Sequence, residues 1–176
     1  MRGVVLVTGV MAAGKSTVAQ ALAERLPRAA HVRGDVFRRM IVSGREEYAP
    51  GASDEASAQL RLRYRLSAAT ADAYAEAGFT AVVQDVVLGE DLTAYVGLVR
   101  TRPLHVVVLA PDAGTVAARE AGRTKTGYGP AWTVSALDEA LRESTPPIGL
   151  WLDTSALTPA RTVEAILAGR ERARVL

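Results

Sequence analysis

One stretch near the start of the chain constrains its fold more than any other. The run Gly9-Val10-Met11-Ala12-Ala13-Gly14-Lys15-Ser16-Thr17 fits the pattern G-x-x-x-x-G-K-[ST]. Before it, residues 4–7 are a β-branched apolar run that predicts a buried strand. After it, Val18, Leu22 and Leu26 recur every four residues, which predicts one face of a helix. Strand, glycine loop and helix in this order argue against a chance match and predict a site for a nucleoside triphosphate.

The residue types of this loop suit an anion. Gly9 and Gly14 let the backbone approach a phosphate without a clashing Cβ. The N–H groups of the loop and the positive end of the following helix then face the anion. Lys15 can reach the β- and γ-phosphates, and the Ser16 hydroxyl is an oxygen ligand of the kind that Mg²⁺ prefers. We therefore expect ATP and Mg²⁺ to bind at residues 9–17.

Length and composition limit the remaining possibilities. The chain has 176 residues, 49% of them apolar, which predicts a single folded domain spanning residues 1–176. Its formal net charge of +2 is compatible with an anionic substrate and does not require nucleic acid. It contains no Cys, which excludes disulfides and thiolate metal sites. We find no signal peptide and no membrane-length apolar run, so we expect a cytoplasmic protein with no membrane partner.

Two acidic residues follow predicted strands. A weak strand at 29–32 leads to Asp35, and a strong strand at 79–85 ends in Gln84 and Asp85. Ligands of open α/β sheets bind at this carboxyl edge. We expect Asp35 to accept a proton from a substrate hydroxyl or to ligate Mg²⁺ indirectly, and the alternative is an N-cap for a helix over 36–40. We expect Asp85 to hold a water of Mg²⁺ or to orient Lys15, and Gln84 to bind the acceptor substrate; the alternative for Asp85 is a turn residue.

A long helix is predicted after a loop over residues 43–53 and before the strand at 79–85. It spans about residues 54–77, and the expected packing face consists of Leu62, Leu66, Ala69, Ala73 and Ala77. Arg61 and Arg65 share one face of this helix, whereas Arg63 points elsewhere. Solvated surface charge is the ordinary interpretation of such arginines. We expect one of the pair Arg61 and Arg65 to contact the acceptor.

The second half of the chain continues the alternation of helices and strands. The pattern predicts helices over 91–100, 112–122, 132–143 and from 158 onwards, and strands over 104–109 and 148–152. Residues 119–130, called the lid below, are basic and rich in glycine, the composition of a segment that closes over a ligand. Arg119 and Arg123 are four residues apart and suit contact with phosphate or with a base. The whole pattern predicts a five-stranded parallel sheet with helices on both faces.

These segments together resemble a known family. The phosphate loop, Gly34-Asp35-Val36-Phe37, Gln84-Asp85 and the lid with its arginines are similar to the small P-loop phosphotransferases, above all to chloramphenicol phosphotransferase-like proteins, near the shikimate and gluconate kinases. The resemblance implies the three-layer P-loop NTPase sandwich with strand order 2-3-1-4-5. It also implies transfer of the γ-phosphoryl group of ATP to a hydroxyl of a small molecule, such as an antibiotic or a sugar-like compound.

The resemblance also implies roles for particular residues. Asp35 matches the catalytic base of the antibiotic-phosphorylating members. Arg119 would lie against the adenine or the phosphates, and Arg123 would clamp the phosphates. The loop that begins with Asp153 and Thr154 would lie beside the adenine. Shikimate kinases have Asp-x-Asp where this chain has Arg33-Gly34-Asp35, which argues against shikimate as the acceptor.

The acceptor itself is not specified by any pattern. We expect its site within residues 36–66, including Phe37 and Arg38. A nucleoside monophosphate kinase and a non-catalytic nucleotide-binding protein remain alternatives. The chain has no Asn-Lys-x-Asp motif for reading guanine, so we expect ATP to be preferred to GTP. Only 5% of the residues are aromatic, which argues against an enzyme acting on nucleic-acid ends.

Overall fold

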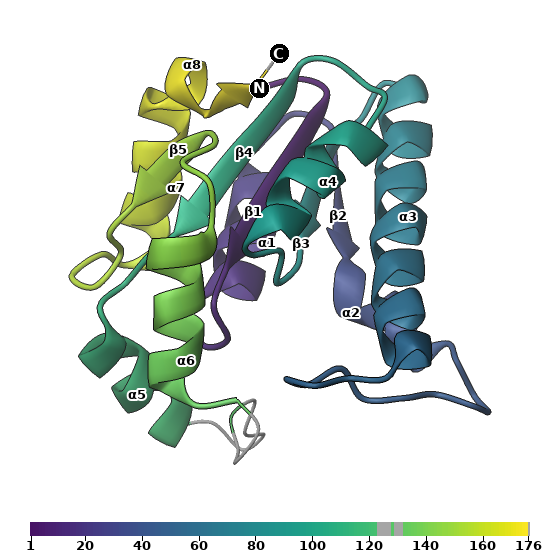
Figure 1. Ribbon diagram of the computed structural model, residues 1–176. Helices are drawn as coiled ribbons and strands as arrows, with labels where there is room; N and C mark the ends of the chain where they lie inside the picture. The colour runs from purple at the N-terminus through teal and green to yellow at the C-terminus, as the bar shows by residue number, and fades with distance from the viewer. Residues whose placement is uncertain (123–127, 129–131, 176) are drawn as a thin grey trace.

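The computed structural model describes residues 1–122, 128 and 132–175, and its centre is a parallel sheet (Figure 1). The strands are β1 (Val4–Gly9), β2 (Ala29–Arg33), β3 (Thr80–Gln84), β4 (Leu104–Leu109), β5 (Leu150–Leu152) and β6 (Arg174–Val175). The parallel strands lie in the order β2-β3-β1-β4-β5, which confirms the predicted order. The two-residue strand β6 pairs antiparallel with β4 at Leu104 and His105, and it was too short to be recognised in the sequence.

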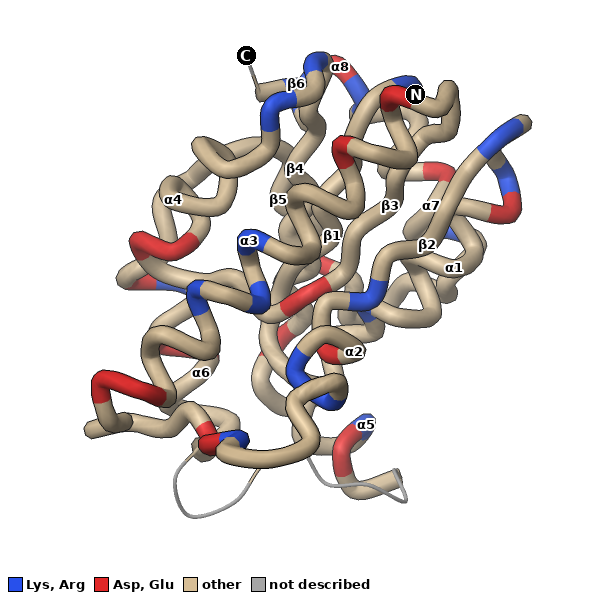
Figure 2. Tube along the Cα trace, turned by 90° about the vertical axis from the view of Figure 1, so that its right-hand side faces the viewer, with Lys and Arg blue, Asp and Glu red and all other residues tan. Residues whose placement is uncertain are grey.

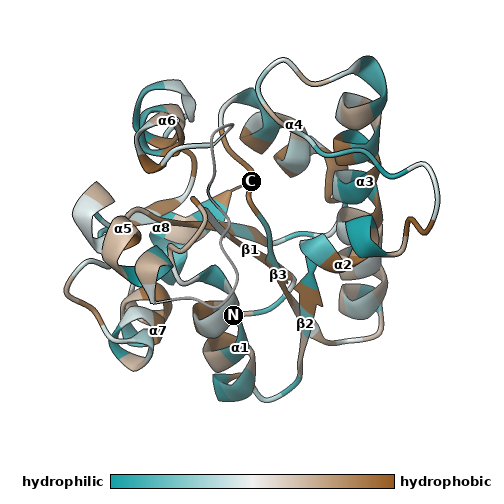
Figure 3. Cartoon of the chain, turned by 90° about the horizontal axis from the view of Figure 1, so that it is seen from below, coloured by the Kyte–Doolittle hydropathy of each residue, from teal (hydrophilic) through white to brown (hydrophobic). Residues whose placement is uncertain are grey.

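Helices cover both faces of this sheet (Figure 3). On one face lie α1 (Lys15–Arg25) and α7 (Pro159–Ala168), and on the other lie α3 (Asp54–Glu76) and α4 (Glu90–Leu98). The shorter helices are α2 (Gly34–Arg39), α5 (Ala113–Ala121), α6 (Val134–Glu139) and α8 (Arg170–Ala173). The helix predicted over 132–143 is instead α6 followed by a π-helical turn, Ala140–Ser144. This arrangement confirms the predicted α/β sandwich.

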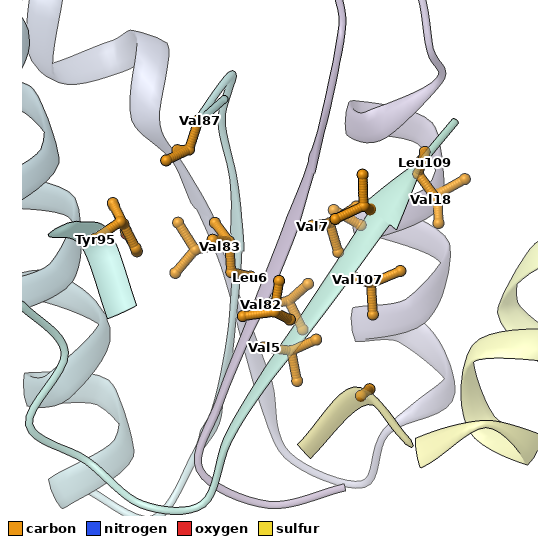
Figure 4. Packing of buried hydrophobic residues seen from close by; sticks show 14 of the residues in the cluster. Val5, Leu6, Val7, Val18, Val82, Val83, Val87, Tyr95, Val107 and Leu109 are labelled. Atoms are coloured by element: carbon orange, nitrogen blue, oxygen red, sulfur yellow. The ribbon is translucent and has the colours of Figure 1, made fainter. Parts of the chain in front are cut away.

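The core is formed mainly by the central strands (Figure 4). Every residue of β1 is buried, and Val82, Val83, Val107 and Leu109 of the neighbouring strands are each fully buried beside it. A parallel strand covered on both faces reads as a continuous apolar run, which is why β1, β3 and β4 were evident in the sequence. Burial of each such side chain contributes about 1.5–3 kcal/mol to the free energy of folding. The ends of these strands are therefore held firmly in place by the core below them.

The prediction of which face of α3 packs against the core is wrong. Leu62 and Leu66 are 36% and 40% exposed, whereas Tyr64, Ser67 and Asp72 are buried. The buried polar groups have partners: the Ser67 hydroxyl lies 2.9 Å from the hydroxyl of Tyr95 on α4, and Asp72 accepts two backbone N–H groups. Polar side chains with such partners can occupy an inner face, so counting only apolar residues selected the wrong side of the helix.

Among the described residues, no helix has the length and apolarity needed to cross a membrane.

Candidate active site

The phosphate loop connects β1 to α1 and has the backbone of an anion cradle. Gly9 and Gly14 have φ angles of 144° and 93°, and Ala12 adopts 60°. A Cβ on Gly9 would lie 2.4 Å from the carbonyl oxygen of Leu109, so only glycine fits there. Gly14 is the N-cap of α1, and within the described part of the chain no side chain caps this helix. The first N–H groups of α1 are therefore left for a ligand, and the loop fits a phosphate group.

Two cations lie at this loop. Lys15 is buried, and its Nζ donates to the carbonyl oxygen of Val10 at 2.7 Å, which holds the ammonium across the loop. Arg119 of α5 donates to the carbonyl oxygen of Ala13 at 3.3 Å and to that of Thr154 at 2.8 Å. The guanidinium of Arg119 thus joins the phosphate loop to the loop after β5. Arg123, predicted to contact phosphate, lies outside the described residues.

The loop after β5 was predicted to lie beside the adenine. Thr154 is 2% exposed, and its Oγ1 has no hydrogen-bond partner in the described part of the protein. Asp153 is exposed, and the side chain and the backbone N–H of Ser155 both donate to it, which lowers the pKa of Asp153. Tyr128, in the lid, donates its hydroxyl proton to the carbonyl oxygen of Met11 at 2.7 Å. Tyr128 was not predicted as a site residue, because no local sequence pattern connects it to the phosphate loop.

The predicted magnesium ligands differ in their availability. The hydroxyl of Ser16 is at the exposed start of α1 and donates to Oε1 of Gln84. Ser16 therefore suits a metal held beside the phosphates, since its hydroxyl is an oxygen ligand at the loop itself. Asp85 has no free oxygen, because Arg63 and the N–H of Val86 occupy both. No cluster of three His, Cys, Asp or Glu residues suited to a metal ion occurs within the described ranges.

Arg63 and Asp85 form a buried ion pair. Nε of Arg63 donates to Oδ2 of Asp85 at 2.8 Å, and Nη2 pairs with Oδ1. The Asp85 side chain is fully buried, and burial lowers the pKa of Arg63. Gly34 makes room for the carboxylate, because a Cβ there would lie 1.9 Å from Oδ2. Arg63, which was predicted to point elsewhere, is thus the arginine of α3 that reaches the carboxyl edge of the sheet.

Asp35 lies in the first turn of α2, directly after this glycine. The N-cap of α2 is Arg33, and no side chain caps the helix within the described residues, so the alternative interpretation of Asp35 as an N-cap is wrong. Its carboxylate forms an ion pair with Arg39 at 2.9 Å and is half exposed. A negative charge in the first turn is favoured by the helix dipole, and the exposed oxygen remains accessible to a ligand.

A cavity of about 500 Å³ opens beside Asp35 and the phosphate loop. Met11 lines it on the side of the loop, Arg63 and Tyr64 line it from α3, and Asp91 lines it from α4. Residues of the predicted acceptor region make up much of the remaining wall: Arg38, Glu46, Glu47, Tyr48, Ala56, Gln59 and Leu60. A pocket of this size is in the ordinary range for a small molecule.

The other residues that were predicted to bind the acceptor lie in different parts of the structure. Arg38 lines the cavity, whereas Phe37 packs against the hydrophobic core and Gln84 is buried beneath the phosphate loop. Arg61 and Arg65 are on the exposed side of α3 and do not line the cavity. The aromatic wall of Tyr48 and Trp132 was not predicted, because its members are 84 residues apart in the chain.

Comparison with known proteins shows the family of the chain. A family model described as an AAA domain matches residues 4–147, which is most of the chain and includes the phosphate loop. The chain belongs to this AAA domain family. No curated protein is similar enough to the sequence to count as a match.

Several solved structures share the fold of this family member. A sugar kinase from Janibacter sp. HTCC2649 has a TM-score of 0.71 at 21% identity, covering 98% of this chain and 96% of the other. A gluconokinase from Sinorhizobium meliloti 1021 has a TM-score of 0.66 at 22% identity, covering 98% and 94%. The tunicamycin resistance protein of Deinococcus radiodurans has a TM-score of 0.69 at 16% identity, covering 100% and 99%. The resemblance to small P-loop kinases is confirmed at the level of the fold.

Proposed function

We propose that this protein is an ATP-dependent kinase that transfers the γ-phosphoryl group to a hydroxyl of a small molecule. The supporting observation is the cavity of about 500 Å³, whose wall includes both Met11 of the phosphate loop and Asp35. A small molecule in this cavity would therefore lie between a carboxylate and the phosphates. The fold shared with a sugar kinase and a gluconokinase supports the same class of reaction.

Each residue of the site has a proposed role. Lys15 and Arg119 hold phosphate oxygens, and Ser16 is an oxygen ligand for Mg²⁺. Bound Mg²⁺ would neutralise part of the phosphate charge. Asp35 accepts the proton of the acceptor hydroxyl, whose oxygen forms the new P–O bond while ADP leaves. Asp85 is proposed to orient Arg63 in the free protein and to accept a hydrogen bond from a water of Mg²⁺.

A nucleoside monophosphate kinase is less well supported. Such an enzyme needs unpaired cations to bind the phosphate of its acceptor. Among the described residues, the cations that line the cavity are Arg38 and Arg63, and each is paired with a carboxylate, Glu47 and Asp85 respectively. This pairing favours an acceptor without a phosphate group.

The substitution Asp35→Asn tests the proposal. It keeps the shape of the side chain but removes the negative charge and the proton acceptor. We expect kcat to fall by about 10²-fold or more, the usual scale for a general base. An ATP-consumption screen across antibiotics, sugars and nucleosides first identifies the acceptor, and kcat is then measured with it.

The control separates catalysis from binding and folding. ATP affinity and melting temperature of Asp35→Asn should stay close to the parent values, because the phosphate loop is unchanged. Arg39→Gln, which removes the ion-pair partner of Asp35 without touching its carboxylate, should retain most of the activity. Near-normal turnover in Asp35→Asn would show that Asp35 is not the base.

A further inference from the structure

The charged residues of the cavity are mostly acidic. Its lining includes the carboxylates of Asp35, Glu46, Glu47 and Asp91 but only two guanidinium groups among the described residues. Figure 2 shows the acidic start of α4 and the mixed acidic and basic residues of α2 and the loop that follows it. The whole chain has a formal net charge of +2, so the cavity has the opposite sign from the protein as a whole.

Each guanidinium group has a carboxylate within ion-pair distance. Arg38 pairs with Glu47, and Arg63 pairs with the buried Asp85 through two of its nitrogens. An anionic acceptor would have to compete with these carboxylates for either arginine. Asp35 pairs with Arg39, so the carboxylates of the lining that remain are Glu46 and Asp91.

Asp91 is the most informative of these carboxylates. Its side chain is partly buried at the start of α4, and no basic side chain lies within ion-pair distance of it in the described part of the chain. Burial raises the pKa of Asp91 and outweighs the lowering by the Tyr64 hydroxyl and by the charge of Arg61. The Tyr64 hydroxyl has one proton, which the carbonyl oxygen of Val86 accepts at 2.9 Å. A carboxylate in this state is stabilised by a cation placed in the cavity.

The aromatic residues of the wall suit the same kind of ligand. The rings of Tyr48 and Trp132 stack with centroids 6.2 Å apart, and the Trp132 indole N–H donates to the carbonyl oxygen of Tyr48 at 3.1 Å. Tyr64 provides a third ring in the lining. Aromatic faces attract ammonium groups, and carboxylates beside them add charge complementarity.

We infer that the acceptor is a hydroxyl compound with a positively charged amine, and that Asp91 is a binding residue for that amine. The inference rests on the proposed function, since it names the substrate class of the same cavity. In this arrangement the acceptor hydroxyl lies toward Asp35 and the phosphate loop, and the ammonium lies toward Asp91 and the aromatic rings. Acceptors with a carboxylate or a phosphate are disfavoured.

The test uses three probes of similar size: benzylammonium, benzyl alcohol and benzoate. Each is titrated into ¹⁵N-labelled protein, and the indole N–H signal of Trp132 is followed by NMR. The chain has only two tryptophans, and Trp151 on β5 does not line the cavity, so its signal is an internal control. We expect benzylammonium to shift the Trp132 signal with an affinity about tenfold or more above that of benzoate, and to leave Trp151 unchanged.

Matched variants assign the effect to Asp91. In Asp91→Asn the affinity for benzylammonium should fall by about tenfold, while that for benzyl alcohol stays the same. Glu24→Gln, an exposed acid on α1, removes the same charge on the opposite face and should change neither. Equal or tighter binding of benzoate, or no shift of Trp132 by benzylammonium, would overturn the inference. Because this assay measures binding without turnover, its result is independent of whether Asp35→Asn confirms or contradicts the kinase activity.

Discussion

At the scale of single residues, the pair Arg63 and Asp85 shows how a buried charge is accommodated. Both oxygens of Asp85 accept hydrogen bonds, and the fixed fork of the guanidinium matches the carboxylate. Removing one partner of such a pair leaves a buried charge and typically costs about 3–5 kcal/mol. The pair thus fixes α3 against the end of β3, which positions one wall of the cavity.

Gly34 is the residue that allows this pair to form. A methyl group at Gly34 would meet Oδ2 of Asp85 at 1.9 Å and displace the carboxylate. We therefore expect Gly34→Ala to lower the free energy of unfolding by about 1–3 kcal/mol, the range for overpacked sites. The measurement is the midpoint of urea unfolding followed by circular dichroism.

Gly97 provides the control for this substitution. It lies in α4, and no heavy atom within 4 Å would meet a Cβ there. Gly97→Ala should leave stability unchanged or raise it by up to about 1 kcal/mol, because alanine is the better helix former. Equal stability of Gly34→Ala and the parent would show that Asp85 can move without losing its arginine.

At the scale of secondary structure elements, the sequence predicted the strands better than the helix faces. The strands β1, β3 and β4 are continuous apolar runs, so both their position and their burial could be read directly. The face of α3 could not, since its inner side includes Ser67 and Asp72, whose partners come from α4 and the turn after it. Because the wrong face of α3 was predicted to be buried, Arg63 was predicted to point away from the site and Arg61 toward it.

Asp72 connects α3 to the turn between α4 and β4. Its oxygens accept the backbone N–H groups of Arg100 at 3.1 Å and Thr101 at 2.9 Å, while its side chain is almost fully buried. Burial by itself would raise the pKa of Asp72, but the hydrogen bonds from Thr101 and Arg100 outweigh it and hold this pKa below its ordinary value of 3.8. A lowered pKa means that folding favours the ionised carboxylate.

We expect Asp72→Asn to lower the free energy of unfolding at pH 7 by about 1–3 kcal/mol, the cost of weakening a buried hydrogen-bonded charge. The stabilisation by Asp72 is complete above the pKa of the unfolded state and is lost as the pH falls through the lower pKa of the folded state. When the pH is lowered below about 4, the free energy of unfolding should therefore decrease less in the variant than in the parent. Urea unfolding at a series of pH values measures both effects.

Glu76 is the matched control on the same helix. It lies 3.7 Å from the same guanidinium of Arg100, but its side chain is 68% exposed. Glu76→Gln should change stability by no more than about 1 kcal/mol, as is typical of surface pairs. If the two variants had the same stability and the same pH dependence, the backbone hydrogen bonds of Asp72 would not be the source of its effect.

At the scale of the whole molecule, the sheet topology brings the site together. The neighbouring strands β2, β3 and β1 end at Arg33, Gln84 and Gly9 in that order. The residues that follow these ends, Asp35, Asp85 and the phosphate loop, therefore lie at one edge of the sheet. This part of the candidate site could be predicted, because the carboxyl ends of parallel strands share an edge. The cavity wall could not, since Tyr48, Asp91 and Trp132 meet only through the packing of separate loops and helices.

The nucleotide preference is a property of this whole assembly and can be measured through its stability. A ligand that binds only the folded state stabilises it by about 2.7 kcal/mol at a hundredfold excess over its Kd. For a domain of this size we expect Tm to rise by about 5–10 °C with ATP and Mg²⁺. GTP should give a smaller shift, since the sequence has no guanine-reading Asn-Lys-x-Asp motif.

Two variants decide whether this shift arises at the phosphate loop. Lys15→Ala removes the ammonium that lies across the loop and donates to the Val10 carbonyl oxygen. The Tm shift with either nucleotide should therefore largely disappear. Arg25→Ala, at the exposed far end of the same helix, should keep the full shift because it removes a cation without touching the loop. Differential scanning fluorimetry of the three proteins gives the comparison. A full shift in Lys15→Ala would place the nucleotide elsewhere, and a larger shift with GTP than with ATP in the parent would reverse the expected base preference.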